Sequence, residues 1–220
     1  MEKSIKIVTV HHDNAIARED GAYTVSINDF YAEETRDVVF EIKLAETISD
    51  EPLPHALVTL SYFDAINGKN CTIGPAACRI ARPDSSIVSP INDHVEEQFV
   101  RIQAVQDMKA AKQEAESGDY EAAQTRLRGC ARRMRSNVNL KEAYVADMVG
   151  DMDEVTRGLG NSSAYAAAGR HTMTNAMMSH GFQRTMRSAV PERSAAPSAM
   201  SRYATSKKVN LSAQYKGGTL

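Results

Sequence analysis

The chain has 220 residues, of which 42% are hydrophobic and 25% are charged, so it can bury the core of one or two domains. Its cysteines, Cys71, Cys78 and Cys130, are odd in number and lack C-x-x-C spacing. This argues against a disulfide framework and a zinc site, and it favours the reducing environment of the cytoplasm. The apolar run near the N-terminus is far shorter than the ~20 residues of a membrane span, so we expect no membrane contact.

The net charge of −2 is divided unevenly along the chain. Residues 158–220 hold eight Lys and Arg but one acid, Glu192, whereas the first 157 residues carry the acidic excess. A solvated, flexible basic end is the simplest interpretation of this pattern. Contact of that end with a nucleic acid or an acidic protein is the alternative, because clustered positive charge attracts both.

The first 85 residues predict a β-rich domain. Short segments rich in β-branched and aromatic residues alternate with polar positions, and turn-forming residues separate them. The expected strands lie near residues 5–10, 23–27, 38–44, 56–63 and 70–81. Short strands without helices between them favour an antiparallel sheet or sandwich. Residues 86–93 are the expected linker, because Pro83 and Pro90 bias this part of the chain toward extended conformations.

Residues 93–159 show the clearest helical periodicity of the sequence. Apolar residues recur every three or four positions on both sides of a central turn, which predicts two antiparallel helices. Asp93, followed three residues later by Glu96, predicts the start of the first helix. Gly118 can adopt the left-handed conformation that ends this helix, and Asp119 can cap the second one.

The apolar stripes of the two helices are expected to face each other. Four of their side chains should then be buried and mutually close: Phe99, Ile102, Tyr120 and Leu127. The turn also resembles the inter-helix turn of a tetratricopeptide repeat. No second copy follows after about 34 residues, so an ordinary helical hairpin is the preferred interpretation.

Two further helices are expected. The third continues the apolar pattern from Leu140 to Leu159, and the fourth begins at Ser162 or Ser163. Gly169 and Gly181 each cost about 1 kcal/mol relative to Ala inside a helix, which predicts a break or a close helix contact near one of them. Beyond residue 188, Ser, Ala, Pro and basic residues dominate and predict a tail of low order.

The sequence contains no pattern of a catalytic or cofactor site. The Gly-rich loops of nucleotide-binding proteins are absent, and the cysteines are interpreted as structural thiols. His11 and His12 are neighbours on an expected strand, so their imidazoles would point to opposite faces and make a poor metal site. Glu33 and Glu34 are neighbours in an expected loop and are interpreted as a solvated acidic patch. We therefore expect no cofactor, no metal and no enzyme activity.

Three stretches resemble one protein family. They are Asp29-Phe30-Tyr31-Ala32-Glu33-Glu34-Thr35-Arg36-Asp37, Tyr165-Ala166-Ala167-Ala168-Gly169-Arg170 and Met178-Ser179-His180-Gly181-Phe182-Gln183-Arg184. The first resembles an acidic, aromatic strand link that ends in Arg-Asp, and the others resemble a late helical signature with Ser-His and Gln-Arg pairs. The family is the region that follows the von Willebrand factor A domain in intracellular proteins, including plant RING-type ubiquitin ligases and proteins in which this region accompanies a hedgehog-intein-like domain.

The resemblance implies a β-sandwich and a helical module without an activity of their own. It also implies family-motif or partner-contact residues: Asp29, Tyr31, Arg36, Asp37, Tyr165, Arg170, His180, Gln183 and Arg184. The sequence contains no A domain with its metal-dependent adhesion site, no RING cysteines and no intein-like block. Ligase activity, metal-dependent binding and self-splicing therefore do not carry over to it.

These observations predict an α+β protein with four parts. They are a β-sandwich-like domain (1–85), a linker (86–93), a helical domain of three to four helices (94–188) and a basic, low-order tail (189–220). The expected function is that of a non-catalytic interaction or scaffold module of a von Willebrand factor A-type protein, with a link to ubiquitin-pathway assemblies. The alternative is binding of a nucleic acid or an acidic partner through the basic end.

The expected partner is a protein, with a von Willebrand factor A domain and a second copy of the chain as candidates, and nucleic acid is not the favoured one. The resemblance further implies that the β part is incomplete and exposes an edge or an apolar face to another polypeptide segment. Residues 209–215, beside Lys207 and Lys208, are one candidate cover within the chain.

Overall fold

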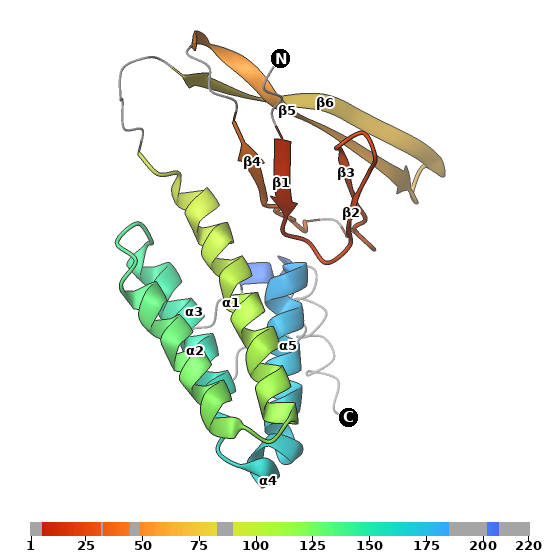
Figure 1. Ribbon diagram of the computed structural model, residues 1–220. Coiled ribbons are helices and arrows are strands. Elements are labelled where there is room, and N and C mark those ends of the chain that lie inside the picture. The colour runs from red at the N-terminus through yellow and green to blue at the C-terminus, as the bar shows by residue number, and fades with distance from the viewer. Residues whose placement is uncertain (1–5, 32, 45–48, 83–89, 185–201, 207–220) are drawn as a thin grey trace. The chain divides into compact units, whose positions relative to one another are not determined.

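The computed structural model describes residues 6–31, 33–44, 49–82, 90–184 and 202–206 (Figure 1). The chain divides into two compact units. The first unit consists of Met1–Val10, Ala17–Thr24 and Phe40–Pro90, and the second consists of His11–Ile16, Val25–Val39 and Ile91–Leu220. The second unit therefore contains two segments from the N-terminal part of the chain, which the predicted boundary at residue 85 assigned to the β-rich domain.

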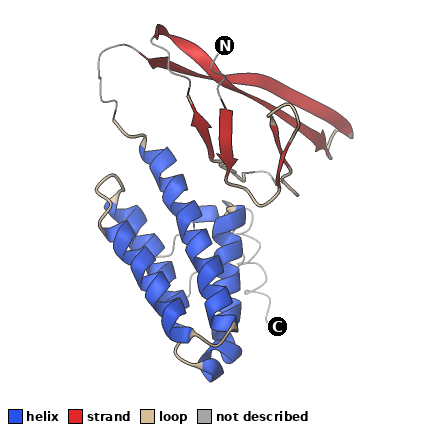
Figure 2. Cartoon of the chain, viewed as in Figure 1, coloured by secondary structure: helices blue, strands red, loops and turns tan. Residues whose placement is uncertain are grey.

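The strands of the described residues pair as three two-stranded antiparallel sheets, which confirms the predicted α+β class (Figure 2). The pairs are β1 (Lys6–Val10) with β4 (Phe40–Lys43), β2 (Ala15–Ala17) with β3 (Tyr23–Val25), and β5 (Ser49–Asp64) with β6 (Lys69–Arg82). Five of these strands overlap the expected ones. The short strand β2 was not predicted, because three residues are too few to show alternation.

The β5–β6 hairpin is the longest paired element. Its register runs from Ser49 opposite Arg82 to Asp64 opposite Lys69, with irregularities that include one between Val58 and Leu60. At that irregularity Gly74 has φ +108°, and a Cβ atom on it would lie 2.7 Å from the carbonyl oxygen of Val58. Glycine is therefore required where the ribbon bends.

The helices make up most of the second unit. They are α1 (Asp93–Glu116), α2 (Tyr120–Arg135), α3 (Glu142–Arg157), α4 (Ser162–Ala164), the π-helical turn η1 (Tyr165–Gly169) and α5 (Arg170–Phe182). Helices α1, α2, α3 and α5 run alongside one another (Figure 1). Their apolar stripes form one core, with these side chains almost fully buried: Met108, Leu127, Met148, Met152, Val155, Leu159 and Met173.

The ends of the first two helices follow the sequence closely, with one correction. Asn92, not Asp93, caps α1, since its side chain accepts a hydrogen bond of 3.1 Å from the backbone N–H of Val95. Gly118 has φ +91° and ends α1 as predicted. The side chain of Asp119 accepts a bond of 2.9 Å from the N–H of Ala122 and caps α2, also as predicted.

The predicted close contact of a late glycine is confirmed at Gly169. This residue ends the π-helical turn, and a Cβ atom on it would lie 2.1 Å from the carbonyl oxygen of Gly158, the residue that ends α3. The two backbones touch because neither residue has a side chain. The cost of glycine in a helix is therefore offset by close packing.

The predicted clustering of four stripe residues is wrong for two of them. Ile102 and Leu127 are buried as expected. Phe99 lies near the start of α1 and its ring contacts His11, with 6.1 Å between ring centroids. Tyr120 follows the loop at the other end of α1 and contacts Tyr165 at 5.8 Å. In an antiparallel hairpin the first residues of one helix meet the last residues of the other, so Phe99 and Tyr120 cannot meet.

Several predictions fall outside the described residues. These are residues 86–89 of the linker, the greater part of the tail and the proposed cover at residues 209–215. Among the residues that the structure describes, none of the helices is both long enough and apolar enough to cross a membrane.

Candidate functional site

A tight loop presents the first of the three sequence motifs to the end of α5. The N–H of Glu34 donates a 3.2 Å bond to the carbonyl of Tyr31, and the N–H of Tyr31 donates a 3.2 Å bond to the carboxylate of Glu34. Glu33 between them has φ +69°, the left-handed conformation that such a turn needs. The loop thereby turns the side chain of Glu34 inward.

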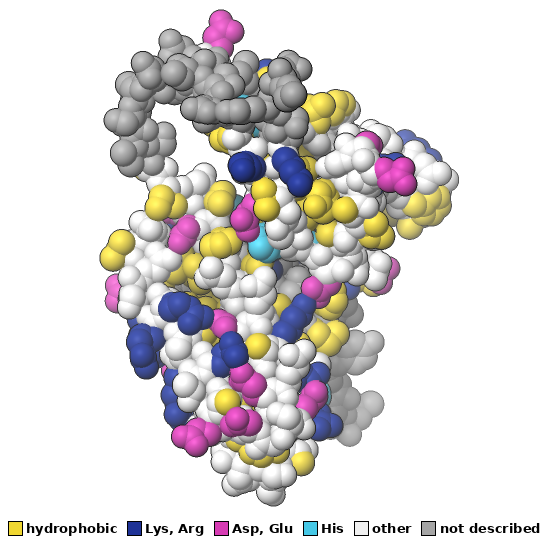
Figure 3. Space-filling view, viewed as in Figure 1, with side chains coloured by type: hydrophobic (Ala, Val, Ile, Leu, Met, Phe, Trp, Pro, Cys, Tyr) yellow, Lys and Arg dark blue, Asp and Glu magenta, His cyan; other side chains and the backbone are white. Residues whose placement is uncertain are grey.

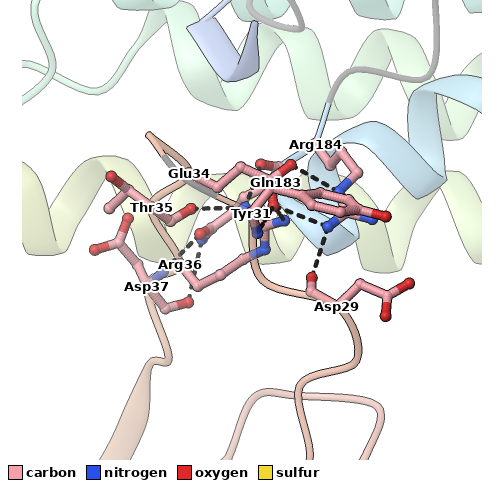
Figure 4. Close-up of polar contacts among 8 residues, drawn as sticks. All are labelled: Asp29, Tyr31, Glu34, Thr35, Arg36, Asp37, Gln183 and Arg184. Carbon is pink, nitrogen blue, oxygen red and sulfur yellow. Dashed lines mark hydrogen bonds and ion pairs between the residues drawn. The ribbon is translucent and has the colours of Figure 1, made fainter. Parts of the chain in front are cut away.

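Glu34 is the centre of the site (Figure 4). Arg184 donates two parallel bonds of 2.8 Å to the two carboxylate oxygens of Glu34, and Arg36 donates a third of 2.7 Å. The Glu34 side chain is only 2% exposed. Its interpretation as part of a solvated acidic patch is therefore wrong, because two guanidinium groups and a backbone N–H replace its hydration.

The environment of Glu34 keeps it ionised. Burial alone would raise the pKa of this carboxyl, but the bonds from Arg184 and Tyr31 and the charge of Arg36 outweigh burial and lower the pKa. The same contact raises the pKa of the Arg184 guanidinium. The three charged groups therefore form a fixed ionic cluster at neutral pH.

Aromatic rings and a backbone carbonyl complete the surroundings of the two arginines. The guanidinium of Arg184 lies over the ring of Tyr31, 4.8 Å from its centroid, and that of Arg36 lies 5.6 Å from the centroid of Phe30. Arg184 also donates a 2.6 Å bond to the carbonyl of Asp29. Each arginine is thus fixed in orientation by several contacts.

The side-chain amide of Gln183 bonds to both backbone groups of Asp37 in the same loop, as the backbone of a neighbouring strand would. Its side-chain oxygen accepts a 2.6 Å bond from the N–H of Asp37, and its side-chain nitrogen donates a 3.1 Å bond to the Asp37 carbonyl. The carbonyl of Gln183 accepts a 3.0 Å bond from Arg36. Gln183 has φ +49° and ends α5, which directs its side chain toward the loop.

A buried arginine extends this polar network into the helical core. Gln183 also donates a 3.2 Å bond to the side chain of Gln98, which accepts a 2.7 Å bond from Arg101. Arg101 donates a further bond of 2.6 Å to the carbonyl of His180. Its burial lowers the pKa of the guanidinium, and among the described residues it forms no ion pair. Gln98 and the His180 carbonyl stabilise its charge as neutral acceptors.

His180 links this network to a later segment of the chain. Its Nε2 lies 3.1 Å from a carboxylate oxygen of Asp151 on α3, and its Nδ1 lies 3.1 Å from the hydroxyl of Tyr203. Burial raises the pKa of the Tyr203 hydroxyl. His180 and Asp151 are 0% and 1% exposed. Carboxylate, imidazole and hydroxyl are thus in hydrogen-bonded order, but a substrate has no access to the imidazole.

A small pocket lies beside the network. Its volume is about 250 Å³, below the ~300–1,000 Å³ typical of small-molecule sites. Thirteen residues line it, among them His12, Asp29, Arg36, Gln183 and Arg184. The two arginines are already bonded to Glu34, so the pocket offers no cluster of uncommitted cations.

The structure brings together six of the nine residues that the resemblance singled out: Asp29, Tyr31, Arg36, Asp37, Gln183 and Arg184. His180 lies deeper in the same network. Tyr165 and Arg170 are separate from it and form their own contact, with the Arg170 guanidinium 5.4 Å from the Tyr165 ring centroid.

Sequence reasoning missed five members of the network: Glu34, Gln98, Arg101, Asp151 and Tyr203. One signal was present for Asp151, which lies between the buried residues Met148 and Met152 on the inner side of α3. A charged residue inside an apolar stripe indicates a buried partner. No comparable signal marks Tyr203, because the segment around it is polar and lacks periodicity.

Comparison of the chain with protein-family models, with curated proteins and with solved structures gave no match. The resemblance to the region after the von Willebrand factor A domain therefore stays a prediction from the residues quoted above.

Proposed function

We propose that the protein is a non-catalytic interaction module that contacts a partner polypeptide through the β5–β6 ribbon. The observation that carries this proposal is the exposure of large apolar side chains on the ribbon (Figure 3). Val58 is 52% exposed, Leu60 53% and Ile73 57%, and Tyr62 is exposed on the same face, while Leu57 and Phe63 are exposed on the opposite one. Contiguous apolar surface of this kind marks interaction sites.

The pairing of the ribbon defines one coherent apolar face. Val58, Leu60 and Tyr62 alternate along β5 and therefore point to the same side. Ile73 lies opposite Leu60, and Cys71 lies opposite Tyr62, so both strands contribute to it. A two-stranded hairpin is at best marginally stable by itself in water. An apolar sheet face of a partner, packed against these residues as in a sandwich, would remove them from water.

The prolines of the ribbon favour its face over its edges as the contact surface. Pro54 in β5 and Pro75 in β6 have no N–H to donate to an added strand. Prolines on an outer strand are a recognised protection against edge pairing. The partner is therefore expected to cover the side chains of the ribbon.

The family resemblance favours an intracellular von Willebrand factor A-type protein as the setting, with ubiquitin-pathway assemblies as the context. Around Glu34, the first and the last resembling stretch bond to each other across about 150 residues of sequence. These stretches thus behave as one structural unit. A second copy of the chain is the competing occupant of the ribbon.

Matched substitutions test the proposal. Leu60→Asn with Ile73→Asn removes two exposed apolar side chains that lie opposite each other on this face of the ribbon, while Val138→Asn makes the same change at a 92% exposed position outside it. We expect the ribbon variant, with unchanged circular dichroism, to lose a partner that the wild type and the Val138 variant both retain from native lysate. Light scattering of the same proteins identifies self-association. Equal recovery of all partners by the three proteins would contradict the proposal.

The basic C-terminal end supports nucleic-acid binding less well. Its described arginines, Arg170, Arg184 and Arg202, each lie over an aromatic ring, and two of them are paired with carboxylates. These groups are already neutralised or stacked within the protein, so they offer little to a phosphate backbone. Binding of a labelled oligonucleotide at low salt that weakens as salt is raised would favour this alternative.

A further inference from the structure

Residues 202–206 lie on the helical bundle as a short, separately held segment. The guanidinium of Arg202 donates bonds of 3.0 and 2.7 Å to one carboxylate oxygen of Asp147 and lies 5.2 Å from the ring centroid of Tyr144. Tyr203 meets His180 edge to face at 5.7 Å, in addition to its hydroxyl bond. Thr205 is 9% exposed. Three of these five residues are thus held against the bundle or buried.

The receiving side chains are positioned by the helices themselves. The hydroxyl of Tyr144 donates a 2.7 Å bond to the carbonyl of Glu97 on α1. The imidazole of His180 is held by Asp151 on α3, and the backbone carbonyl of His180 is held by Arg101 on α1. The surface that accepts Arg202 and Tyr203 is therefore largely formed by contacts that do not involve the segment. Preorganised sites of this kind bind short peptides at a low entropic cost.

We propose that this surface of α3 and α5 is a docking groove for a peptide with an Arg-Tyr pair followed two residues later by a small polar residue. Residues 202–206 occupy the groove as an internal ligand, and a partner segment of the same chemistry competes with them. The carboxylate of Asp147 selects the arginine, the ring of Tyr144 stacks on it, and Nδ1 of His180 selects the tyrosine hydroxyl. This inference rests on the proposed interaction function and adds a second, chemically defined partner class.

Residues 202–206 and a free peptide of the same sequence are expected to compete for this surface, and the competition can be measured. Residues 185–201 connect the end of the α5 region to the segment. A ligand that belongs to the same chain as its site binds at an effective concentration that can reach the order of millimolar. A free peptide is therefore expected to displace the segment only near that concentration, and to bind far more tightly once the tethered copy is disabled.

The experiment uses the full chain and a fluorescein-labelled peptide of residues 202–206. The release variant carries Arg202→Glu and Tyr203→Ala, and binding is followed by fluorescence anisotropy. We expect saturable binding to the release variant, at least tenfold weaker binding to the wild type, and no binding of a peptide whose tyrosine is replaced by alanine. Adding Asp147→Asn to the release variant should weaken peptide binding several-fold. A folded release variant that does not bind the peptide would overturn the proposal.

A second measurement keeps the test decisive if the release variant does not fold. Hydrogen exchange of the wild-type chain is recorded with and without excess peptide. Amides of residues 202–206 should exchange faster when the peptide is present, while those of α3 stay unchanged. If the segment exchanges only together with α3, it is an integral part of the core and the groove does not exist. Variants of the β5–β6 ribbon should leave peptide binding intact, so the two proposals fail independently.

Discussion

Replacing Arg184 with methionine should destabilise the helical unit strongly, because it removes one side of a buried bidentate ion pair. Arg184 donates two bonds to Glu34 and one to the carbonyl of Asp29, and its side chain is 21% exposed. Breaking a buried pair costs about 3–5 kcal/mol. Glu34 retains the bonds from Arg36 and from the N–H of Tyr31, so a smaller cost, about 2–3 kcal/mol, is expected.

A surface pair provides the matched control. Arg135 and Asp153 are 3.5 Å apart, and their side chains are 55% and 53% exposed, so Arg135→Met should cost less than about 1 kcal/mol. Both variants and the wild type are compared by urea unfolding, followed by circular dichroism at 222 nm. The Arg184 variant should also lower the melting temperature by several degrees. Equal unfolding curves for the two variants would show that Glu34 does not depend on Arg184, and the reasoning would be refuted.

Three other predictions concern the same unit. Leu127→Ala should cost roughly 2–5 kcal/mol in unfolding free energy, because the side chain is fully buried in the core, and a thermal melt equal to that of the wild type would contradict this. Gly169→Ala should prevent stable folding through the clash with Gly158, whereas Gly129→Ala, whose added Cβ meets only a side-chain atom at 3.7 Å, should be neutral or stabilising in the same melt. The pKa of Glu34 is lowered in the folded state, so the ionised carboxylate stabilises the fold fully above about pH 4.5, the pKa of an unperturbed Glu. This stabilisation is lost as the pH falls through the folded pKa. In acid titrations, the unfolding free energy of Glu34→Gln should therefore fall less steeply than that of the wild type.

The sequence was sufficient for those parts of the fold that local rules determine. The turn at Gly118 and Asp119 follows from the left-handed preference of glycine and the capping ability of aspartate, and both act within four residues. The sequence predicted either a helix break or a close helix contact near Gly169 or Gly181, and the contact is found at Gly169. Its partner Gly158 could not be identified, because the contact joins residues 11 positions apart through a π-helical turn that no periodicity reveals.

The site itself depends on contacts that the sequence does not encode locally. Glu34 lies in a polar stretch whose composition is typical of a surface loop. It is a buried acid because Arg184, 150 positions later in the sequence, bonds to its carboxylate. The family resemblance did select residues on both sides of this contact. It could not show that Gln183 uses its side-chain amide as a substitute backbone for Asp37, which depends on the left-handed end of α5.

The direction of the pKa shifts in the helical unit supports a structural role for its buried titratable groups. Burial and the neighbouring charge of Asp107 raise the pKa of the Cys130 thiol to about 12, and burial raises the pKa values of the Tyr144 and Tyr203 hydroxyls. Burial lowers the pKa of His12. The contacts of Glu34 with Arg184, Arg36 and the N–H of Tyr31 lower the pKa of the Glu34 carboxyl.

An acid–base catalyst or a nucleophile needs a pKa moved toward neutrality, as in a raised carboxyl or a lowered thiol. These five groups move the other way, so at neutral pH the thiol and the hydroxyls keep their protons and the carboxyl stays ionised. Each group is thereby held in one protonation state, which suits hydrogen bonds that must stay fixed. Among the described residues, the bonds of Glu34 to Arg36 and Arg184 are one such fixed connection, and they join the loop around Glu34 to the end of α5.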